Sequence, residues 1–225
     1  MNYRLLLLSV LFVPSVSLQA QVTVVNPTPA LGEVVEVRTF NSAEVQRQLS
    51  LAPRMIVATP VAVVPTPAPS VATTTTTTVV ETPGRPRRVY NSERSVVLVE
   101  DQGKSVELPY VTLPVLFLKE TADLLDIESR FALQEVAGVI IALNETTPGT
   151  QFAIEGHTST DGTDEFNLSL SGMRAKRIFD ELTQRYGVPA SMLSAQGYGE
   201  NFPMYPQGNE AQMQLDRRVL VVRTN

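Results

Sequence analysis

Proline and threonine dominate residues 58–83, and this stretch limits where the chain can build a packed core. Prolines stand at positions 60, 65, 67, 69 and 83, threonine fills positions 73–78 without a break, and Glu81 is the only charged residue. Proline fixes the backbone and cannot donate a hydrogen bond to a sheet, so we expect a semi-rigid, largely unpacked Pro/Thr-rich linker over 58–93. A short edge strand at Val61–Val64 is the alternative.

The regions on either side of this stretch differ in kind. After it, Arg85, Arg87 and Arg88 form a cluster that can touch an anionic polymer or a lipid, although a solvated linker end is the simpler prediction. Before it, residues 21–57 hold too little periodic apolar sequence for a core of their own. The short elements expected there are strands at Val22–Val25 and Val34–Val37 and a helix from Ser42 to Leu49 with Ser42 as its N-cap.

The first twenty residues have the layout of a secretory signal peptide. Arg4 precedes an apolar run from Leu5 to Val13, Pro14 breaks the run, and small residues lead to a cleavage site after Ala20. The run is about nine residues long, against the roughly twenty that span a bilayer. A buried N-terminal helix is the alternative. We therefore expect 1–20 to direct export, and we expect no transmembrane segment in the mature chain.

Composition excludes several classes of function. The 225 residues include no cysteine and one histidine, His157, and the net charge is −5 with 43% hydrophobic residues. The chain can bury a core, but it has no thiol nucleophile, no cysteine–zinc site and no multi-histidine metal centre. Its mild acidity argues against nucleic-acid binding. No motif supports an enzyme, so we predict no catalytic residue, no cofactor and no metal.

From residue 94 onward, strand and helix patterns alternate. Ser95–Glu100 and Ser105–Leu108 flank a turn and predict a β-hairpin within 94–112. The order that follows, β-α-β-α-β-β, predicts an α+β sandwich over 113–225, with two helices on one face of a mixed sheet. Its expected elements are strands at Leu113–Leu118, Gln151–Glu155, Leu193–Tyr198 and Arg217–Arg223 and helices at Ile127–Leu143 and Asp164–Tyr186.

The second of these helices carries polar side chains beside its apolar stripe. At 100° steps, Asn167, Ser171 and Arg174 fall along one border of the stripe, next to the glycine-flanked loop 156–162. Loop amides and the positive end of the helix favour a carboxylate, and Arg174 adds a planar fork that can hold one. The residues alone thus predict a small pocket for an anionic or zwitterionic ligand. The stripe itself consists of Leu168, Ala175, Ile178, Phe179, Leu182 and Tyr186.

A series of short motifs makes the region recognisable. The motifs are Gly156-His157-Thr158, Gly162, Asn167, Leu170-Ser171, Arg174-Ala175, Gly197-Tyr198-Gly199-Glu200, Pro203, Asn209 and Arg217-Arg218-Val219. With them, residues 113–225 resemble the OmpA-like C-terminal domain, a family that includes peptidoglycan-associated lipoproteins and flagellar stator subunits with periplasmic domains. The resemblance implies a non-enzymatic domain. With the expected export, it places the protein in the periplasm or cell envelope, where association with the outer membrane would come through a partner. It implies binding of peptidoglycan through the diaminopimelate of the stem peptide.

The resemblance carries over to the ligand-binding residues only in part. Arg174 matches the helix arginine of the family, and Asn167 matches the asparagine before it. Ser159 stands where the family usually has an aspartate directly after the His-Thr pair. Serine can accept a hydrogen bond from an ammonium group but supplies no charge, and loss of a charge-assisted bond costs about 1–3 kcal/mol.

Thr158, Asp161 and Arg218 complete the candidate set of ligand-binding residues. Arg217 and Arg218 are expected on opposite faces of the last strand, so that one lines the pocket and the other meets solvent. We assign Arg218 to the pocket, with Arg217 as the alternative. For Arg174, a structural ion pair with Asp161 is the alternative to ligand binding.

Two functions remain open on this evidence. The first is a binding module that tethers the envelope to the cell wall, with the linker letting another part of the chain reach a second layer. The second is a structural or protein-interaction module of the same fold with weak or lost peptidoglycan affinity, which Ser159 makes credible. In either case we expect an envelope protein partner to bind through residues 21–57.

Overall fold

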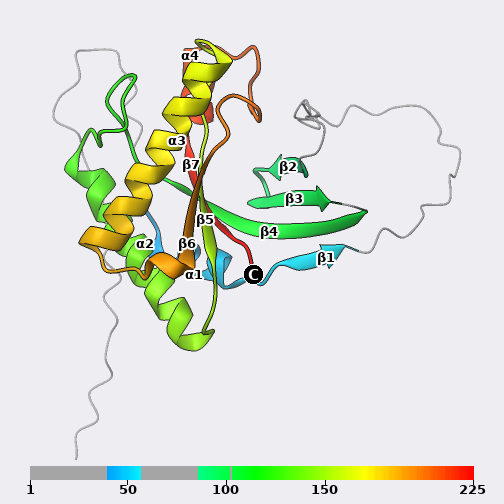
Figure 1. The fold of residues 1–225 in the computed structure, drawn as a ribbon, viewed down its shortest axis with the longest axis vertical. Coiled ribbons are helices and arrows are strands. Elements are labelled where there is room, and N and C mark those ends of the chain that lie inside the picture. Colours follow the sequence, from blue (N-terminus) through cyan, green and yellow to red (C-terminus); the bar gives the residue numbers. More distant parts are fainter. Residues whose placement is uncertain (1–39, 57–85, 102) are drawn as a thin grey trace, which may run out of the picture. The chain divides into compact units, whose positions relative to one another are not determined.

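The computed structural model describes residues 40–56, 86–101 and 103–225. The expected signal peptide, the strands expected at Val22–Val25, Val34–Val37 and Val61–Val64, and most of the expected linker lie outside the described residues. The elements, shown in Figure 1, are α1 (Ser42–Ser50), β1 (Arg54–Ile56), β2 (Arg87–Asn91), β3 (Val96–Asp101), β4 (Lys104–Leu113), α2 (Ile127–Thr146), β5 (Phe152–Gly156), α3 (Asp164–Asp180), the π-helical turn η1 (Glu181–Arg185), the 3-10 turn η2 (Ala190–Met192), β6 (Leu193–Gly197), α4 (Glu210–Asp216) and β7 (Val219–Arg223).

The strands form one mixed sheet in the order β2-β3-β4-β7-β5-β6, and β1 pairs with β4 beside this path. All neighbours are antiparallel except β5 and β6. The long strand β4 joins the two halves of the sheet, because its first part pairs with β1 and β3 and its last four residues pair with β7. The predicted α+β sandwich is confirmed: the order β-α-β-α-β-β is present as β4-α2-β5-α3-β6-β7, with α4 inserted before the last strand.

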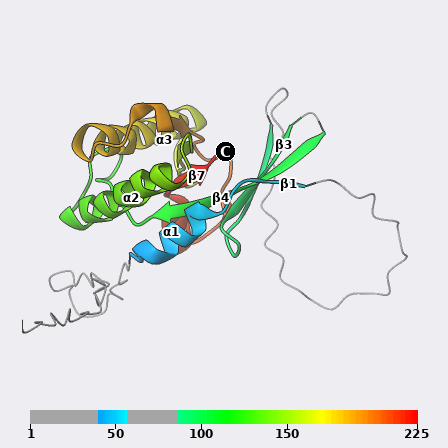
Figure 2. The same ribbon diagram turned by 90° about the horizontal axis from the view of Figure 1, so that it is seen from below.

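Strand β7 shows how the sheet divides the core. Val219 and Val221 contribute to the larger core, which also takes residues from all three of the longer helices, α1, α2 and α3. Leu220 and Val222 belong to a smaller cluster on the other face, together with Tyr90 of β2 and Val97 of β3. Figure 2 shows the helices gathered on one side of the sheet. Helix α1 is part of this core, since Leu49 is fully buried.

The strand predicted at Leu113–Leu118 is wrong. The strand of this region is β4, which ends at Leu113, and the apolar residues after it belong to a loop. Pro114 has no N–H to donate to a neighbouring strand. Val115 is buried in the core and Phe117 packs against its edge, so their apolar character reflects burial of the loop.

Helix ends follow the expected chemistry, with one difference in residue. Asn41, rather than the predicted Ser42, caps α1, because its side chain accepts a hydrogen bond from the Glu44 amide at 3.1 Å. Thr163 caps α3 in the same way. Within the described ranges, no helix has the combined length and apolar character that crossing a membrane would require.

Of the three arginines after the Pro/Thr-rich stretch, Arg88 does not belong to a solvated linker end, and Arg85 lies outside the described residues. Arg87 and Arg88 lie in β2, and the Arg88 side chain is only 14% exposed. Strands β1 and β2, which flank residues 57–85, lie in the same sheet. The residues between Ile56 and Arg87, which include most of the expected linker, therefore connect two strands of one sheet.

Helix α3 approaches the sheet so closely that only glycine fits beneath it. A Cβ atom at Gly197 would stand 2.3 Å from the backbone nitrogen of Gly172, and one at Gly156 would stand 2.2 Å from the carbonyl oxygen of Ser171. The contact lets the Ser171 hydroxyl accept a hydrogen bond from the Gly199 amide at 2.8 Å. This approach fixes the middle of α3 against the ends of β5 and β6.

Candidate functional site

A pocket of about 660 Å³ lies where the β5–α3 loop meets the segment before α2 and the end of α4. Five of the six predicted ligand-binding residues line it, and Arg217 joins them. The lining consists of Val115, Leu116, Phe117, Lys119, Glu120, Thr158, Ser159, Asp161, Gly162, Phe166, Asn167, Leu170, Arg174, Glu210, Gln214 and Arg217. The predicted residue that does not line the pocket is Arg218.

Arg174 is held in the pocket by neutral groups. Its Nε donates a hydrogen bond to the Thr121 carbonyl at 2.9 Å, and its guanidinium lies 4.9 Å from the ring centre of Phe117. It is 7% exposed, and burial together with the nearby Arg217 lowers its pKa. Among the described residues no carboxylate pairs with it, so the expected alternative of an ion pair with Asp161 is wrong. A buried cation without a counter-charge is energetically unfavourable, so an anion that paired with it would be stabilised there.

Asn167 organises the loop that forms one wall of the pocket. Its Nδ2 donates to the carbonyls of Ser159 and Asp161, at 3.3 and 2.8 Å, and to the Glu200 carboxylate. The side chain is 3% exposed and Arg174 is 7% exposed, so both residues are buried at the side of α3 that faces the loop. Because its donors are used within the loop, Asn167 positions the other pocket residues.

Arg217 gathers the remaining polar side chains of the pocket. Its Nη2 pairs with Asp161 at 3.0 Å, its Nη1 pairs with Glu210, and its Nε donates to the Ser159 hydroxyl at 3.1 Å. Hydrogen bonding to Glu210 raises the pKa of Arg217, in contrast to the lowered pKa of Arg174. The pocket thus holds two arginines, one already paired with acids and one without an acidic partner among the described residues.

The assignment of Arg218 to the pocket is wrong, and the alternative, Arg217, is the residue that lines it. Arg218 is 8% exposed on the other side of the sheet, where its Nη2 donates to the Phe202 carbonyl and Nη1 lies 3.4 Å from Asp216. The two residues do not alternate along a strand, because Arg217 is the C-cap of α4 and β7 begins at Val219.

Thr158 and the loop backbone retain unused hydrogen-bonding groups. The Thr158 amide donates to the Gly199 carbonyl at 2.9 Å, but its buried hydroxyl has no partner within the described residues. The amides of Ser159 and Asp161 donate to no backbone carbonyl of the described chain. Together with Arg174, these groups make the pocket suited to an anionic ligand.

Comparison with known proteins places the pocket in a family. Residues 116–217 match the model of the OmpA family. These residues are an OmpA-family domain. They include every residue of the pocket except Val115.

Two relatives of the OmpA-family domain show the extent of the match. Outer membrane porin F of Pseudomonas aeruginosa is 39% identical over 72 residues, which are 32% of this chain and 21% of the porin. The peptidoglycan-associated lipoprotein of Pasteurella multocida is 34% identical over 80 residues, 36% of this chain and 53% of the lipoprotein. This chain therefore covers about a fifth of the one and about half of the other. The crystal structure of the peptidoglycan-associated lipoprotein from Burkholderia pseudomallei aligns with a TM-score of 0.43 at 26% identity, covering 49% of this chain and 88% of that one.

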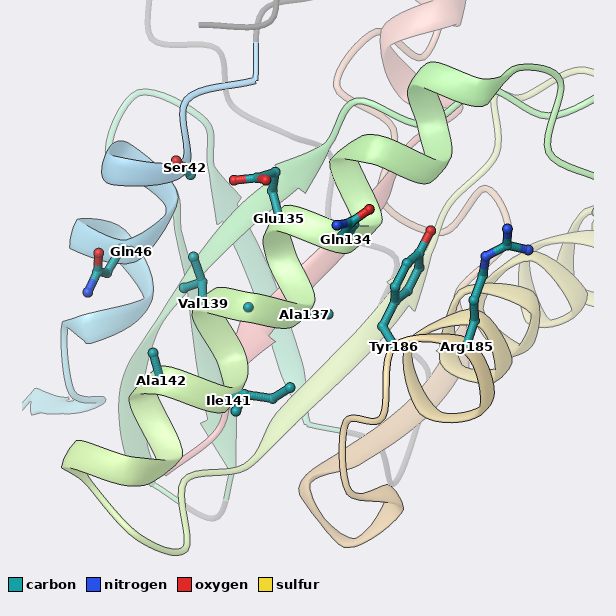
Figure 3. Close-up of a pocket in the computed structure, with 11 residues that line it drawn as sticks. Ser42, Gln46, Gln134, Glu135, Ala137, Val139, Ile141, Ala142, Arg185 and Tyr186 are labelled. Atoms are coloured by element: carbon teal, nitrogen blue, oxygen red, sulfur yellow. The ribbon is translucent and has the colours of Figure 1, made fainter. Parts of the chain in front are cut away.

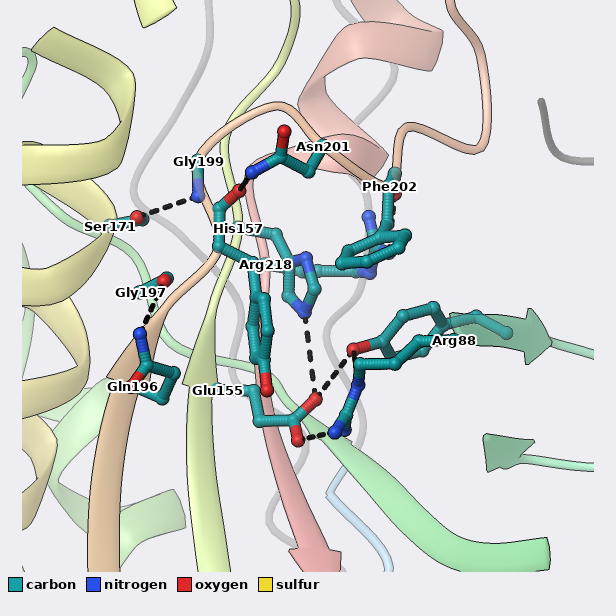
Figure 4. A network of polar contacts seen from close by, with 12 residues as sticks. Arg88, Glu155, His157, Ser171, Gln196, Gly197, Gly199, Asn201, Phe202 and Arg218 are labelled. Carbon is teal, nitrogen blue, oxygen red and sulfur yellow. Dashed lines mark hydrogen bonds and ion pairs between the residues drawn. The ribbon is translucent and has the colours of Figure 1, made fainter. Parts of the chain in front are cut away.

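A buried polar network joins the OmpA-family domain to β2, which precedes it in sequence (Figure 4). Glu155, 2% exposed, pairs with Arg88 and accepts a hydrogen bond from the Tyr90 hydroxyl at 2.7 Å. Burial raises the pKa of Glu155, and the Arg88 charge opposes that rise. The network gives Arg88 a structural role that the sequence did not indicate.

His157 lies at the other end of this network, away from the pocket. It is 1% exposed and stacks on Tyr198, with ring centres 5.6 Å apart. Neither ring nitrogen has a hydrogen-bond partner in the described part of the chain, although Nε2 is 4.0 Å from Glu155. Burial, with Arg218 and Arg88 nearby, lowers its pKa well below the ordinary value. His157 is therefore a packed, neutral residue at the base of the loop.

A second hollow of about 690 Å³ lies between α1, α2 and η1 (Figure 3). Small and aliphatic side chains of α2, such as Ala137, Ala142 and Ile141, form its floor, and Gln46 and Arg185 stand at its sides. It has no buried, unpaired charge comparable to Arg174. The pocket beside α3 is therefore the candidate functional site.

Proposed function

We propose that this protein is a non-enzymatic cell-envelope protein of the periplasm that binds peptidoglycan without a covalent bond and tethers the envelope to the cell wall. The OmpA-family domain supports this, together with the similarity to a protein named peptidoglycan-associated lipoprotein. The ligand is the diaminopimelate of the stem peptide, and it enters the pocket beside α3. Export by residues 1–20, association with the outer membrane and an envelope partner for residues 21–57 are parts of the same proposal.

The observation that carries the proposal is the state of Arg174. Its guanidinium is buried, its Nε is used by a carbonyl, and its two Nη groups have no hydrogen-bond partner among the described residues. Those two groups can hold both oxygens of one carboxylate. A charge-assisted pair of this kind contributes about 1.5–3 kcal/mol, or roughly ten- to a hundred-fold in affinity.

The test is sedimentation of the protein with purified peptidoglycan. We expect Arg174→Ala to abolish sedimentation while the melting temperature shows that the domain remains folded. Arg185→Ala is the matched control, because Arg185 is an exposed arginine beyond the end of the same helix, and it should sediment like the wild type. Unchanged sedimentation of Arg174→Ala would refute the pocket. Walls with diaminopimelate-type and lysine-type stem peptides, compared in the same assay, test the choice of ligand.

The second candidate function is a structural or protein-interaction module with weak or lost peptidoglycan affinity. The observation in its favour is Ser159, which is 3% exposed and gives the buried part of the pocket a hydroxyl instead of a charge. Failure of the wild-type protein to sediment with either wall would support it. Release of products on timed incubation with wall fragments would instead indicate an enzyme.

A further inference from the structure

The acidic side chains of the pocket are all engaged with cations. Glu120, Asp161 and Glu210 line it. Asp161 and Glu210 both pair with Arg217, and Glu120 lies 3.6 Å from Lys119. In the described lining, every acidic side chain therefore already has a cation beside it.

These acids are also poorly placed to bind a cation tightly. The side chains of Asp161 and Glu210 are 59% and 71% exposed, so water solvates them. A new ion pair at such a position contributes about 0–1 kcal/mol, which is at most about five-fold in affinity. The buried position on the loop is occupied by Ser159, whose hydroxyl already accepts a hydrogen bond from Arg217.

Arg174 has the opposite character, since it is buried and has no carboxylate partner in the described chain. The electrostatic asymmetry is therefore strong: the pocket offers a desolvated site to an anion and only solvated, already paired sites to a cation. We propose that the pocket binds a carboxylate whose affinity does not depend on a neighbouring ammonium group, and that Ser159 sets this preference. The inference rests on the proposed function and specifies what the pocket recognises in its ligand.

The experiment is calorimetric titration of the full chain with three forms of one stem tripeptide that ends in diaminopimelate. The first form is unmodified, the second has the free side-chain amine acetylated, and the third has the side-chain carboxylate amidated. We expect acetylation to weaken binding by less than about five-fold, because it removes only the ammonium. We expect amidation to weaken it at least ten-fold, because it removes the group that faces Arg174.

The outcomes separate this inference from the proposed function. If acetylation weakens binding ten-fold or more, the pocket recognises a zwitterion, and the inference is wrong while peptidoglycan binding stands. If amidation has no effect, the carboxylate does not meet Arg174, and the inference is wrong in its central step. If no form of the tripeptide and no purified wall binds, both the proposed function and this inference fail.

Substitution of Ser159 tests the assigned cause of the preference. Ser159→Asp adds a buried carboxylate beside Arg217, whose single positive charge is already shared by Asp161 and Glu210. The added charge therefore remains uncompensated and shielded from water, so the ratio of affinities for the free and acetylated tripeptides should rise to at least ten. Ser159→Asn is the matched control, because it has nearly the same shape without the charge, and its ratio should stay near that of the wild type. A folded Ser159→Asp protein with an unchanged ratio would overturn the role of Ser159.

Discussion

The buried histidine gives this protein a pH dependence that can be traced to one residue. His157 is neutral in the folded state because burial and two nearby arginines lower its pKa. In the unfolded chain it takes up a proton with an ordinary pKa near 6.5. The unfolded state therefore binds more protons as the pH falls below about 6.5. The contribution of His157 to the free energy of unfolding is complete above that pH and is lost as the pH falls toward the lowered pKa.

His157→Phe should remove this dependence. Between pH 7 and pH 5 the free energy of unfolding of the wild type should fall, relative to the variant, by up to about 1.4 kcal/mol per pH unit. Urea unfolding at several pH values measures the two slopes. Glu155, whose raised pKa acts in the opposite direction, is present in both proteins. Parallel slopes would mean that His157 is not held neutral.

The pocket residues show which positions can be identified from the sequence alone and which cannot. Arg174, Asn167 and Ser159 were identifiable from their motif and from helical spacing, and they do line one pocket. Arg217 was misjudged in favour of Arg218 because strand alternation was applied to a residue that caps a helix. The helix itself, α4, went unpredicted. Its signal was present in the sequence as Asn209 and Gln212, which form a capping box.

At the scale of elements, the contact between α3 and the sheet depends on glycine. Gly197→Ala would drive a methyl group to 2.3 Å from the backbone of α3, so the helix has to move. We expect the free energy of unfolding to fall by at least about 2 kcal/mol, and binding to weaken because Arg174 moves with the helix. Gly138→Ala in α2 is the control, since no atom lies within 4 Å of its added Cβ, and it should be neutral or stabilise by up to about 1 kcal/mol. Chemical denaturation of the wild type and the two variants measures the changes in stability, and sedimentation with peptidoglycan measures the change in binding.

The buried ion pair between Arg88 of β2 and Glu155 of β5 also connects two elements. Arg88→Ala leaves the buried Glu155 carboxylate without its cation, and this should cost about 3–5 kcal/mol. Adding Glu155→Gln should recover part of the loss, because the uncompensated charge is then absent. Arg87→Ala is the neighbouring control: its pair with Glu100 is exposed at the surface and should be worth about 0–1 kcal/mol. Denaturation midpoints that are equal for the two arginine variants would contradict the buried network.

The elements that the sequence predicted well are those whose pattern is local. Helices α2 and α3 and strand β5 follow from apolar spacing and stop signals within one segment. The strand expected at Leu113–Leu118 failed because apolar residues in a buried loop resemble a strand. The place of β2 in the sheet was missed for another reason. Arg88 is buried beside a carboxylate partner, Glu155, that lies 67 residues away in the sequence. Such distant pairing leaves no periodic signal near the residue itself.

For the whole molecule, the structural unit begins earlier than the family match. Residues Phe40–Asn225 form one compact unit, whereas the OmpA-family match covers 116–217. A fragment of residues 113–225 lacks β4, the neighbour of β7, and also lacks Leu49 and Arg88. We expect that fragment to melt well below a fragment of residues 40–225, as measured by circular dichroism. Equal melting temperatures would mean that the N-terminal elements only decorate a self-sufficient domain.

Strands β1 and β2, on either side of residues 57–85, lie in the same sheet, and this limits what the length of that segment can change. Strand β1 ends at Ile56 and β2 begins at Arg87, and β4 holds the first directly and the second through β3. Both ends of the intervening segment are therefore fixed on the same support. Adding or deleting residues between those two ends should leave the distance from either strand to the pocket beside α3 unaltered.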